Sequence, residues 1–240
     1  MSINIATDAG GAASLIEINS ATKIFKSNGA TFEALRGIDL RISQGDFVSI
    51  TGESGSGKST LLSIIGGITP PSKGDVTVDG LRIYTLDSER LADFRREYIG
   101  FVFQQFHLIP YLTAIENVML PLSITAKKDK EGLALEALRG VGIKEKAHRL
   151  PSELSGGEQQ RAAIARALVN EPRIILADEP TGNLDTKTGS EIFGLFRELN
   201  SGGRTVIIVT HNPELASKTR RTVCMKDGMI ERIRENAAAL

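Results

Sequence analysis

The sequence predicts an α/β fold, in which a mainly parallel sheet is covered on both faces. Predicted strands and helices alternate along most of the 240-residue chain. The runs 174–176 and 206–209 are wholly apolar, which is typical of parallel strands that are buried on both faces. A glycine-rich loop, 52–59, joins a predicted strand directly to a predicted helix. These three observations predict the fold class.

The individual elements follow from apolar patterns bounded by turn residues. In the first part of the chain the predicted strands are 14–20, 36–43, 46–51 and 74–80, and the helix is 58–67. Later strands are predicted at 98–103, 173–178 and 204–210. The last segment, 221–233, is predicted to be a hairpin, because Asp227-Gly228 is a strong turn signal between two apolar runs.

The middle of the chain differs, because the signals from Leu112 to about Glu153 are helical and predict no strand. We therefore expect one domain at 14–234. Its core is expected at 14–103 and 155–234, with a helical subdomain inserted at 104–154. The Gly/Ala-rich residues 1–13 are predicted to be a disordered tail, and 235–240 a frayed end.

The composition excludes several classes of protein. Lys plus Arg and Asp plus Glu both number 29, so the net charge gives no reason to expect nucleic acid as a partner. The one cysteine, Cys224, cannot form an internal disulfide, which fits a reducing compartment. The N-terminus lacks the basic start and apolar run of a signal peptide. No segment approaches the roughly 18 apolar residues of a membrane span.

The loop after the strand 46–51 has the spacing of a phosphate-binding P-loop. Gly52, Gly57, Lys58 and Ser59 fit the pattern Gly-x4-Gly-Lys-[Ser/Thr] between a strand and a helix. Glycines let successive N–H groups surround a phosphate, while Lys58 is expected to reach the β- and γ-phosphates and Ser59 to ligate Mg²⁺. The predicted phosphate-binding residues are Gly52, Glu53, Ser54, Gly55, Ser56, Gly57, Lys58, Ser59 and Thr60. The motif alone leaves kinases, GTPases and ATPases open.

Two carboxylates, Asp178 and Glu179, follow the predicted strand 173–178. Ligands of open α/β sheets bind beyond the carboxyl ends of the strands. We therefore expect Asp178 to help hold Mg²⁺ from outside its inner coordination sphere. Glu179 is expected to polarise a water for attack on the γ-phosphate, as a general base.

A further feature is the start of the strong helix pattern at 154–166, where Ser155 precedes Gly156 and Gly157. Glycine destabilises a helix interior by about 1 kcal/mol relative to alanine. The residues leave two interpretations open. Ser155 is a plain N-cap, or the segment presents bare backbone N–H groups and a helix N-terminus to an anion.

Together these segments resemble the ATP-binding-cassette (ABC) ATPases. LSGGEQQR, followed by ALVNEPRIILADEPTGNLD, resembles the signature loop, Walker B strand and D-loop of that family, and the resemblance extends from Ile16 to about Ile233. It implies ATP hydrolysis with ATP and Mg²⁺ bound to a P-loop NTPase (RecA-like) core, which carries an antiparallel β subdomain and an inserted α-helical subdomain. In this family the signature loop contacts the nucleotide of a partner subunit. The resemblance therefore implies a homodimer in which Ser155, Gly156 and Gly157 face the γ-phosphate across the interface.

The resemblance also implies roles for single residues. Phe25 matches the aromatic residue that stacks on adenine, with a core-strand phenylalanine as the alternative. Gln104 matches the Q-loop glutamine, which senses Mg²⁺ and the attacking water. Asp185 matches the D-loop aspartate that contacts the opposite site, and His211 the switch histidine near the γ-phosphate. The implied catalytic residues are Glu179, His211, Gln104 and Lys58, and the implied metal-binding residues are Ser59, Gln104 and Asp178.

Two segments, 103–122 and 177–189, resemble stand-alone cassettes of the lipoprotein-release and macrolide-exporter (LolD/MacB-like) group. This implies an integral-membrane permease (FtsX/MacB-like) as partner, a place on the cytoplasmic face of the inner membrane, and export or extraction of a substrate. An apolar cluster is the expected docking surface, with burial in the insert's own core as the alternative: Phe106, Leu108, Ile109, Tyr111 and Leu112. A regulator without cargo, like the cell-division (FtsE-like) cassette, is the alternative function. A cassette acting on DNA or ribosomes is disfavoured by the neutral charge and the single cassette.

Overall fold

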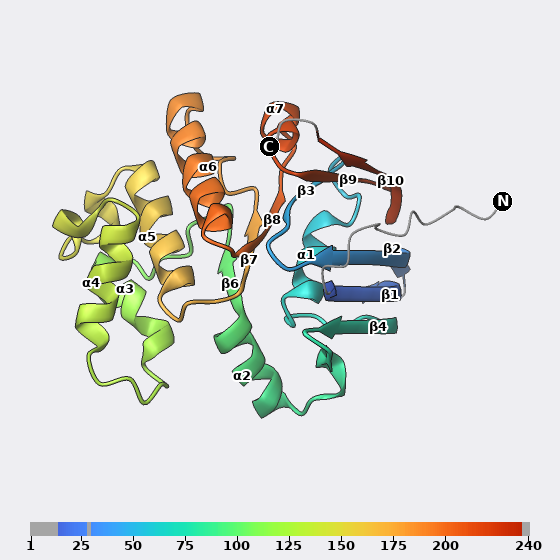
Figure 1. Ribbon diagram of the computed structural model, residues 1–240, viewed down its shortest axis with the longest axis horizontal. Coiled ribbons are helices and arrows are strands. Elements are labelled where there is room, and N and C mark those ends of the chain that lie inside the picture. The colour runs from blue at the N-terminus through green and yellow to red at the C-terminus, as the bar shows by residue number, and fades with distance from the viewer. Residues whose placement is uncertain (1–13, 28–29, 237–240) are drawn as a thin grey trace.

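The computed structural model describes residues 14–27 and 30–236 (Figure 1). The predicted tail at 1–13 lies outside the described residues, as do residues 237–240 of the predicted frayed end. Glu235, in contrast, ends a strand and pairs with Arg221. The side chain of the next residue, Asn236, donates hydrogen bonds to the backbone carbonyl oxygens of Ala216 (3.1 Å) and Thr219 (2.9 Å). The ordered pairing thus continues past the limit that the sequence predicts at residue 234.

A six-stranded sheet forms the centre of the molecule, with the strand order β10-β9-β3-β8-β7-β6. All neighbouring strands are parallel except β10, which pairs antiparallel with β9 at one edge. The strands are β3 (Phe47–Thr51), β6 (Ile99–Val102), β7 (Ile174–Asp178), β8 (Thr205–Val209), β9 (Arg221–Lys226) and β10 (Met229–Glu235). Asp227 and Gly228 join the last two, and their φ angles of 47° and 78° suit a type I′ turn. The predicted strands and hairpin are confirmed.

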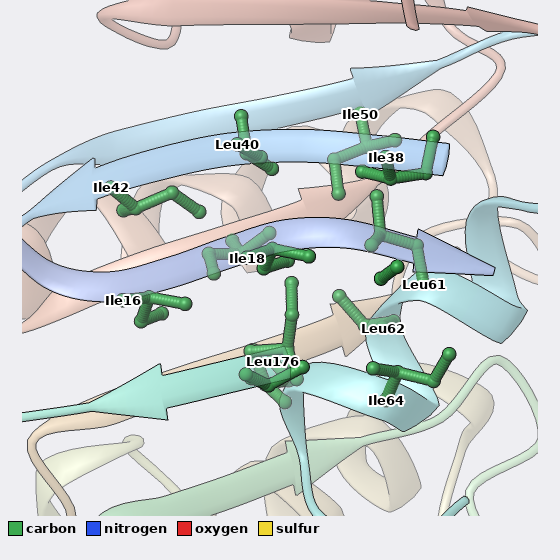
Figure 2. Close-up of a cluster of buried hydrophobic side chains, with 14 of the residues drawn as sticks. Ile16, Ile18, Ile38, Leu40, Ile42, Ile50, Leu61, Leu62, Ile64 and Leu176 are labelled. Carbon is green, nitrogen blue, oxygen red and sulfur yellow. The ribbon is translucent and has the colours of Figure 1, made fainter. Parts of the chain in front are cut away.

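A second, antiparallel sheet has the order β2-β1-β4-β5. Its strands are β1 (Ser14–Ser27), β2 (Ala30–Ser43), β4 (Lys73–Val78) and β5 (Leu81–Arg82). Between the two sheets lies α1 (Lys58–Ile65), and their apolar side chains share one core. Figure 2 shows Ile18 of the antiparallel sheet, Leu62 of α1 and Leu176 of the parallel sheet within this core. The predicted antiparallel subdomain is confirmed.

The opposite face of the six-stranded sheet is covered by helices, on the left of Figure 1. Of these, α5 (Gly156–Leu168) and α6 (Thr186–Ser201) lie against the sheet, and α3 (Ala114–Met119) and α4 (Lys130–Gly140) pack against α5. Alternation along β7 explains its wholly apolar sequence, because Leu176 packs in the first core and Ile175 in the second. Within the described residues, 112–153 contain helices and no strand, as predicted.

The remaining helices connect these layers. The α-helices are α2 (Ser88–Tyr98) and α7 (Pro213–Ser217), and the short 3₁₀ helices are η1 (Ile83–Thr85), η2 (Leu120–Leu122), η3 (Lys144–Lys146) and η4 (Pro151–Glu153). The helix α2 is not among the elements that the sequence analysis predicts, and Phe94 is its one buried side chain. In the ranges that the structure describes, no helix combines the length and apolar character needed to cross a bilayer.

Candidate active site

A cavity of about 440 Å³ lies beside the loop that joins β3 to α1. The loop contributes Gly52, Ser54, Gly55, Gly57, Lys58, Ser59 and Thr60 to its lining. Three predicted site residues from distant segments line the same cavity: Gln104, Glu179 and His211. The fold therefore brings four predicted segments together at one place. The two other predicted loop residues face elsewhere, since Ser56 is buried and Glu53 lines a neighbouring cavity.

The loop keeps its shape through close backbone packing. Gly57 has φ +96°, and a Cβ atom there would lie 2.5 Å from the Ala34 carbonyl oxygen, so glycine is required. Gly57 also precedes α1 as a cap without a side chain. The first amides of that helix therefore stay available to an anion. Lys58 Nζ donates hydrogen bonds to the carbonyl oxygens of Gly52 (2.9 Å) and Glu53 (2.8 Å), which hold the ammonium group at the cavity.

Glu179 and His211 meet because their strands are neighbours. β7 and β8 pair in parallel, with Asp178 opposite Val209, so the residues that follow each strand lie at one edge of the sheet. His211 Nδ1 lies 2.8 Å from Glu179 Oε2. An ionised carboxylate only accepts hydrogen bonds, so we assign the proton of this contact to Nδ1. The Glu179 side chain is 16% exposed and that of His211 72%, so the carboxylate is the enclosed member of the pair.

Asp178 ends β7 beside the cavity. Burial raises the pKa of Asp178 above its usual value, while the Ser59 hydroxyl acts in the opposite direction and the Glu179 charge adds to the rise. Its buried Oδ1 atom has no hydrogen-bond partner within the described part of the chain. A buried carboxylate oxygen near a serine hydroxyl is the type of donor set that a hard cation such as Mg²⁺ prefers. The residues at this point are therefore compatible with a magnesium ion.

Gln104 is held against the segment that follows β7. Its Nε2 atom donates to Asn183 Oδ1 (3.4 Å), and Asn183 Nδ2 donates to the Gln104 carbonyl oxygen (3.1 Å). The Gly182 backbone lies close to the Gln104 side chain, since a Cβ atom on Gly182 would lie 2.9 Å from Gln104 Nε2. The sequence analysis does not single out Asn183, since its contact with Gln104 spans 79 positions and no local pattern encodes it.

The helix α5 begins with a complete capping box. Ser155 Oγ accepts from the Glu158 N–H (3.3 Å), and Glu158 Oε2 accepts from the Ser155 N–H (2.8 Å). The N-cap interpretation is therefore correct as a description of one chain. Of the described residues that line the 440 Å³ cavity, none belongs to the segment 155–157. Figure 1 shows α5 and α1 on opposite faces of the central sheet.

The two glycines of that segment differ in their surroundings. A Cβ atom on Gly157 would lie 2.5 Å from Thr188 Cγ2 of α6, so the packing of the two helices requires a glycine there. A Cβ atom on Gly156 would have Leu184 Cδ2 at 3.5 Å and Phe106 Cζ at 3.9 Å, which are ordinary contacts. Packing within one chain therefore accounts for Gly157 and leaves Gly156 without a steric reason.

Phe25 and Asp185 lie outside the cavity lining. Phe25 is 43% exposed on β1, so the alternative of a core phenylalanine is wrong. Lys23 Nζ lies 5.2 Å from the centre of its ring. Asp185 is the N-cap of α6, where its Oδ1 accepts from the N–H groups of Lys187 and Thr188, each at 3.1 Å. Hydrogen bonds from Thr188 are the main reason that the pKa of Asp185 is lowered.

The apolar cluster after Gln104 is partly buried. Tyr111 is 77% exposed, and the other four members are half-buried: Phe106, Leu108, Ile109 and Leu112. Fully buried Asn117 holds this segment, because its Oδ1 accepts from the Ile109 N–H (2.7 Å) and its Nδ2 donates to the Ile109 and Leu112 carbonyls (3.1 and 3.0 Å). Arg166 donates to the Phe106 carbonyl oxygen (2.9 Å). Asn117 and Arg166 thus hold the backbone of this segment, while the Tyr111 side chain is exposed to solvent.

Known proteins that resemble this chain establish its family. The ABC transporter family model matches residues 35–182. The chain belongs to the ABC transporter family. An ABC transporter ATP-binding protein of Thermotoga maritima is 48% identical over 221 residues, which are 91% of this chain and 94% of that protein. The family resemblance carried by the sequence motifs is confirmed, and the chain is an ATP-binding cassette with an ATPase fold.

The cassette also resembles a longer protein and solved dimers. The macrolide export ATP-binding/permease protein MacB of Bdellovibrio bacteriovorus is 46% identical over 217 residues, which are 90% of this chain and 33% of MacB. The cassette thus spans about a third of that relative. A dimeric structure of the cassette MJ0796 of Methanocaldococcus jannaschii, bound to ADP and Pi, has a TM-score of 0.85 and 46% identity. It covers 92% of this chain and 98% of MJ0796.

Proposed function

We propose that the cassette hydrolyses ATP at sites shared between two copies of the chain, and that hydrolysis drives an integral-membrane permease. The observation that carries this proposal is the separation of two phosphate-binding segments. The loop 52–59 lines the cavity, while the segment 155–157 begins a helix on the other face of the sheet. Because the segment 155–157 does not line the cavity of its own chain, we infer that a second copy supplies the missing half of the site.

The different surroundings of the two glycines support the same arrangement. Gly156 lowers helix propensity, yet packing within the chain would accept a side chain there. A glycine at such a position is useful where another molecule approaches the backbone closely. We therefore assign Ser155, Gly156 and Gly157 to the γ-phosphate bound by the partner copy, where the hydroxyl, the exposed backbone and the α5 N-terminus all attract negative charge. The solved MJ0796 dimer with ADP and Pi is consistent with this assignment.

The residues around the cavity suit hydrolysis of the γ-phosphate. The loop amides and Lys58 bind and orient the β- and γ-phosphates. Glu179 polarises the attacking water, a role that typically contributes about 10²–10⁴ in rate. His211 lies 2.8 Å from the Glu179 carboxylate and holds it in place. Gln104, held by Asn183, is proposed to orient the water and the metal.

Ser59, Gln104 and Asp178 are the proposed magnesium-binding residues. The orphaned Asp178 oxygen and the Ser59 hydroxyl fit this ion, which usually keeps several waters and takes only one or two protein ligands beside the phosphates. When bound, Mg²⁺ neutralises charge on the phosphate oxygens. The protein's contribution is to hold oxygen donors at the edge of the sheet, where the strands β3 and β7 end.

Other predicted features complete the proposal. Phe25 is proposed to stack on adenine. Asp185, which caps α6, is proposed to contact the opposite site of the dimer as well. We also propose the division into a core at 14–103 and 155–234 and a helical subdomain at 104–154. Gln104 stands at their junction and is therefore placed to transmit the state of the nucleotide to the helices.

The proposed docking surface for the permease is the apolar cluster around Tyr111. Its members lie beyond Gln104 and are fixed by Asn117 and Arg166, so a movement of Gln104 reaches them through a stiff segment. MacB relatives are named as ATP-binding and permease proteins in one chain, and the cassette matches a third of such a chain. We propose an FtsX/MacB-like permease, a location on the cytoplasmic face of the inner membrane, and export or extraction of a substrate.

The test of the shared site is the variant Glu179→Gln. It should bind ATP, lose turnover and accumulate as an ATP-bound dimer, because the water is no longer polarised. Gel filtration with ATP and Mg²⁺ measures the dimer, and Lys58→Ala in the same background is the matched control that should remain monomeric. A monomer with bound ATP in the Glu179→Gln variant would contradict the proposal.

A further inference from the structure

The cavity beside the phosphate loop is lined by an aromatic residue that the sequence analysis does not assign. We propose that Phe32 contacts the base of the bound purine nucleotide, as a second aromatic side chain beside Phe25. This inference rests on the proposed assignment of the cavity to ATP. Phe32 lines that cavity, whereas Phe25 does not, and Phe32 is 57% exposed. An open phenylalanine beside a phosphate-binding loop has a surface that a base can cover.

The strand register places the two aromatic residues together. Phe25 of β1 and Phe32 of β2 are direct partners in the antiparallel ladder. Such partners project from the same face of a sheet, with Cβ atoms about 4.5–5.5 Å apart. One side of the Phe25 ring already faces the Lys23 ammonium, which the Pro70 carbonyl holds at 2.7 Å. Among the described residues, no aromatic or cationic side chain stacks on Phe32.

The backbone connects Phe32 to the phosphate loop over a short distance. Ala34 is an extra residue between the pairs Lys23–Leu35 and Ile24–Glu33, so it forms a bulge that bends β2. At this bulge the Ala34 carbonyl packs against Gly57. Phe32 precedes Ala34 by two strand residues, a span of about 7 Å. The ring therefore stands where the sugar and base of a nucleotide leave the phosphate loop.

This position predicts which part of the nucleotide Phe32 recognises. Stacking on an aromatic ring depends on the flat face of a base and needs no hydrogen-bond pattern. Phe32→Leu keeps the apolar character and loses the ring, so it should raise the Kd of ATP by about tenfold. Inorganic tripolyphosphate, which has no base, should bind the variant and the parent chain equally well.

The experiment uses the absence of tryptophan from the sequence. In the full chain, Phe32→Trp adds a single fluorophore, and Leu81→Trp on β5, at a 40% exposed position outside the cavity, is the matched control. ATP should quench the Phe32→Trp emission, tripolyphosphate should not, and the control should respond to neither. A parental Kd of ATP in Phe32→Leu, or equal weakening of both probes, would overturn the role of Phe32. If Lys58→Ala binds both probes like the parent chain, the assignment of the cavity itself fails, and this inference with it.

Discussion

The variant Gly156→Ala tests whether the glycine at position 156 is needed within one chain or at the contact between two chains. Within the chain, the new methyl group would have Leu184 at 3.5 Å and Phe106 at 3.9 Å, without a clash. Alanine is favoured over glycine in a helix by up to about 1 kcal/mol. The nucleotide-free variant should therefore be as stable as the parent chain or more stable, with a rise in Tm of up to about 4 °C for a domain of this size.

Gly157→Ala is the matched control, because its methyl group would lie 2.5 Å from Thr188 Cγ2. Thr188 is β-branched and stands in the first turn of α6, where its N–H donates to Asp185 Oδ1, so its methyl group cannot move away freely. Overpacking of this kind costs about 1–3 kcal/mol. The nucleotide-free Gly157→Ala variant should therefore melt below the parent chain. The pair of variants thus predicts opposite effects on the isolated chain from one methyl group at adjacent positions.

In the ATP-bound dimer, the Gly156→Ala substitution should be destabilising, in contrast to its effect on the nucleotide-free chain. If the γ-phosphate of the partner's nucleotide approaches this backbone, the added methyl should weaken the dimer by about ten- to a hundredfold, by the same overpacking cost. Circular dichroism gives the melting temperatures, and gel filtration in the Glu179→Gln background gives the dimer. A Gly156→Ala variant that dimerises and hydrolyses ATP like the parent chain would refute the reasoning.

Two further predictions concern buried polar groups. Burial raises the pKa of Asp178. At pH values above that pKa, the charged carboxylate therefore destabilises the folded state. Asp178→Asn should therefore raise the nucleotide-free Tm at neutral pH, by an amount that shrinks as the pH falls through the raised pKa, while ATPase activity drops. Melting curves across pH check this, and a lower Tm at neutral pH would be the contrary result. Asn117→Ala should lower the unfolding free energy by about 2–3 kcal/mol, because it removes the partners of the Ile109 and Leu112 backbone groups, yet keep the Kd of ATP. Urea unfolding and nucleotide titration measure both, and an unchanged urea midpoint would contradict it.

The sequence predicts those parts of the fold whose signals are local. The wholly apolar 174–176 predicts a strand covered on both faces, and Asp227-Gly228 predicts its turn, because each depends on a few adjacent residues. The helix 88–98 is missed because its helically spaced Leu91, Phe94 and Tyr98 stand among charged residues, and only Phe94 is fully buried. The helix 186–201 is also not predicted, although its buried Ile192, Phe193 and Phe196 have helical spacing and carry the signal.

The residues of the candidate site also differ in whether a local pattern reveals them. The loop 52–59 is a contiguous pattern, and its residues are found from spacing alone. The contact between Glu179 and His211 depends on the pairing of β7 with β8, which the order of strands along the chain does not reveal. Phe32 stands in a polar stretch without periodicity, and only its register opposite Phe25 and its place at the cavity distinguish it. Residues that act through tertiary contacts are therefore the ones that the sequence analysis misses.

The most direct measurement of the shared site mixes two defective chains. Lys58→Ala damages the phosphate loop, and Ser155→Ala removes a hydroxyl whose bond to a charged phosphate is worth about ten- to a hundredfold in activity. In a mixed dimer, the intact loop of one copy faces the intact Ser155 segment of the other. Random pairing then gives an equimolar mixture up to about a quarter of the parental ATPase rate, above that of either variant alone. A mixture no more active than the average of its two components would show that each chain completes its own site, and would contradict the account.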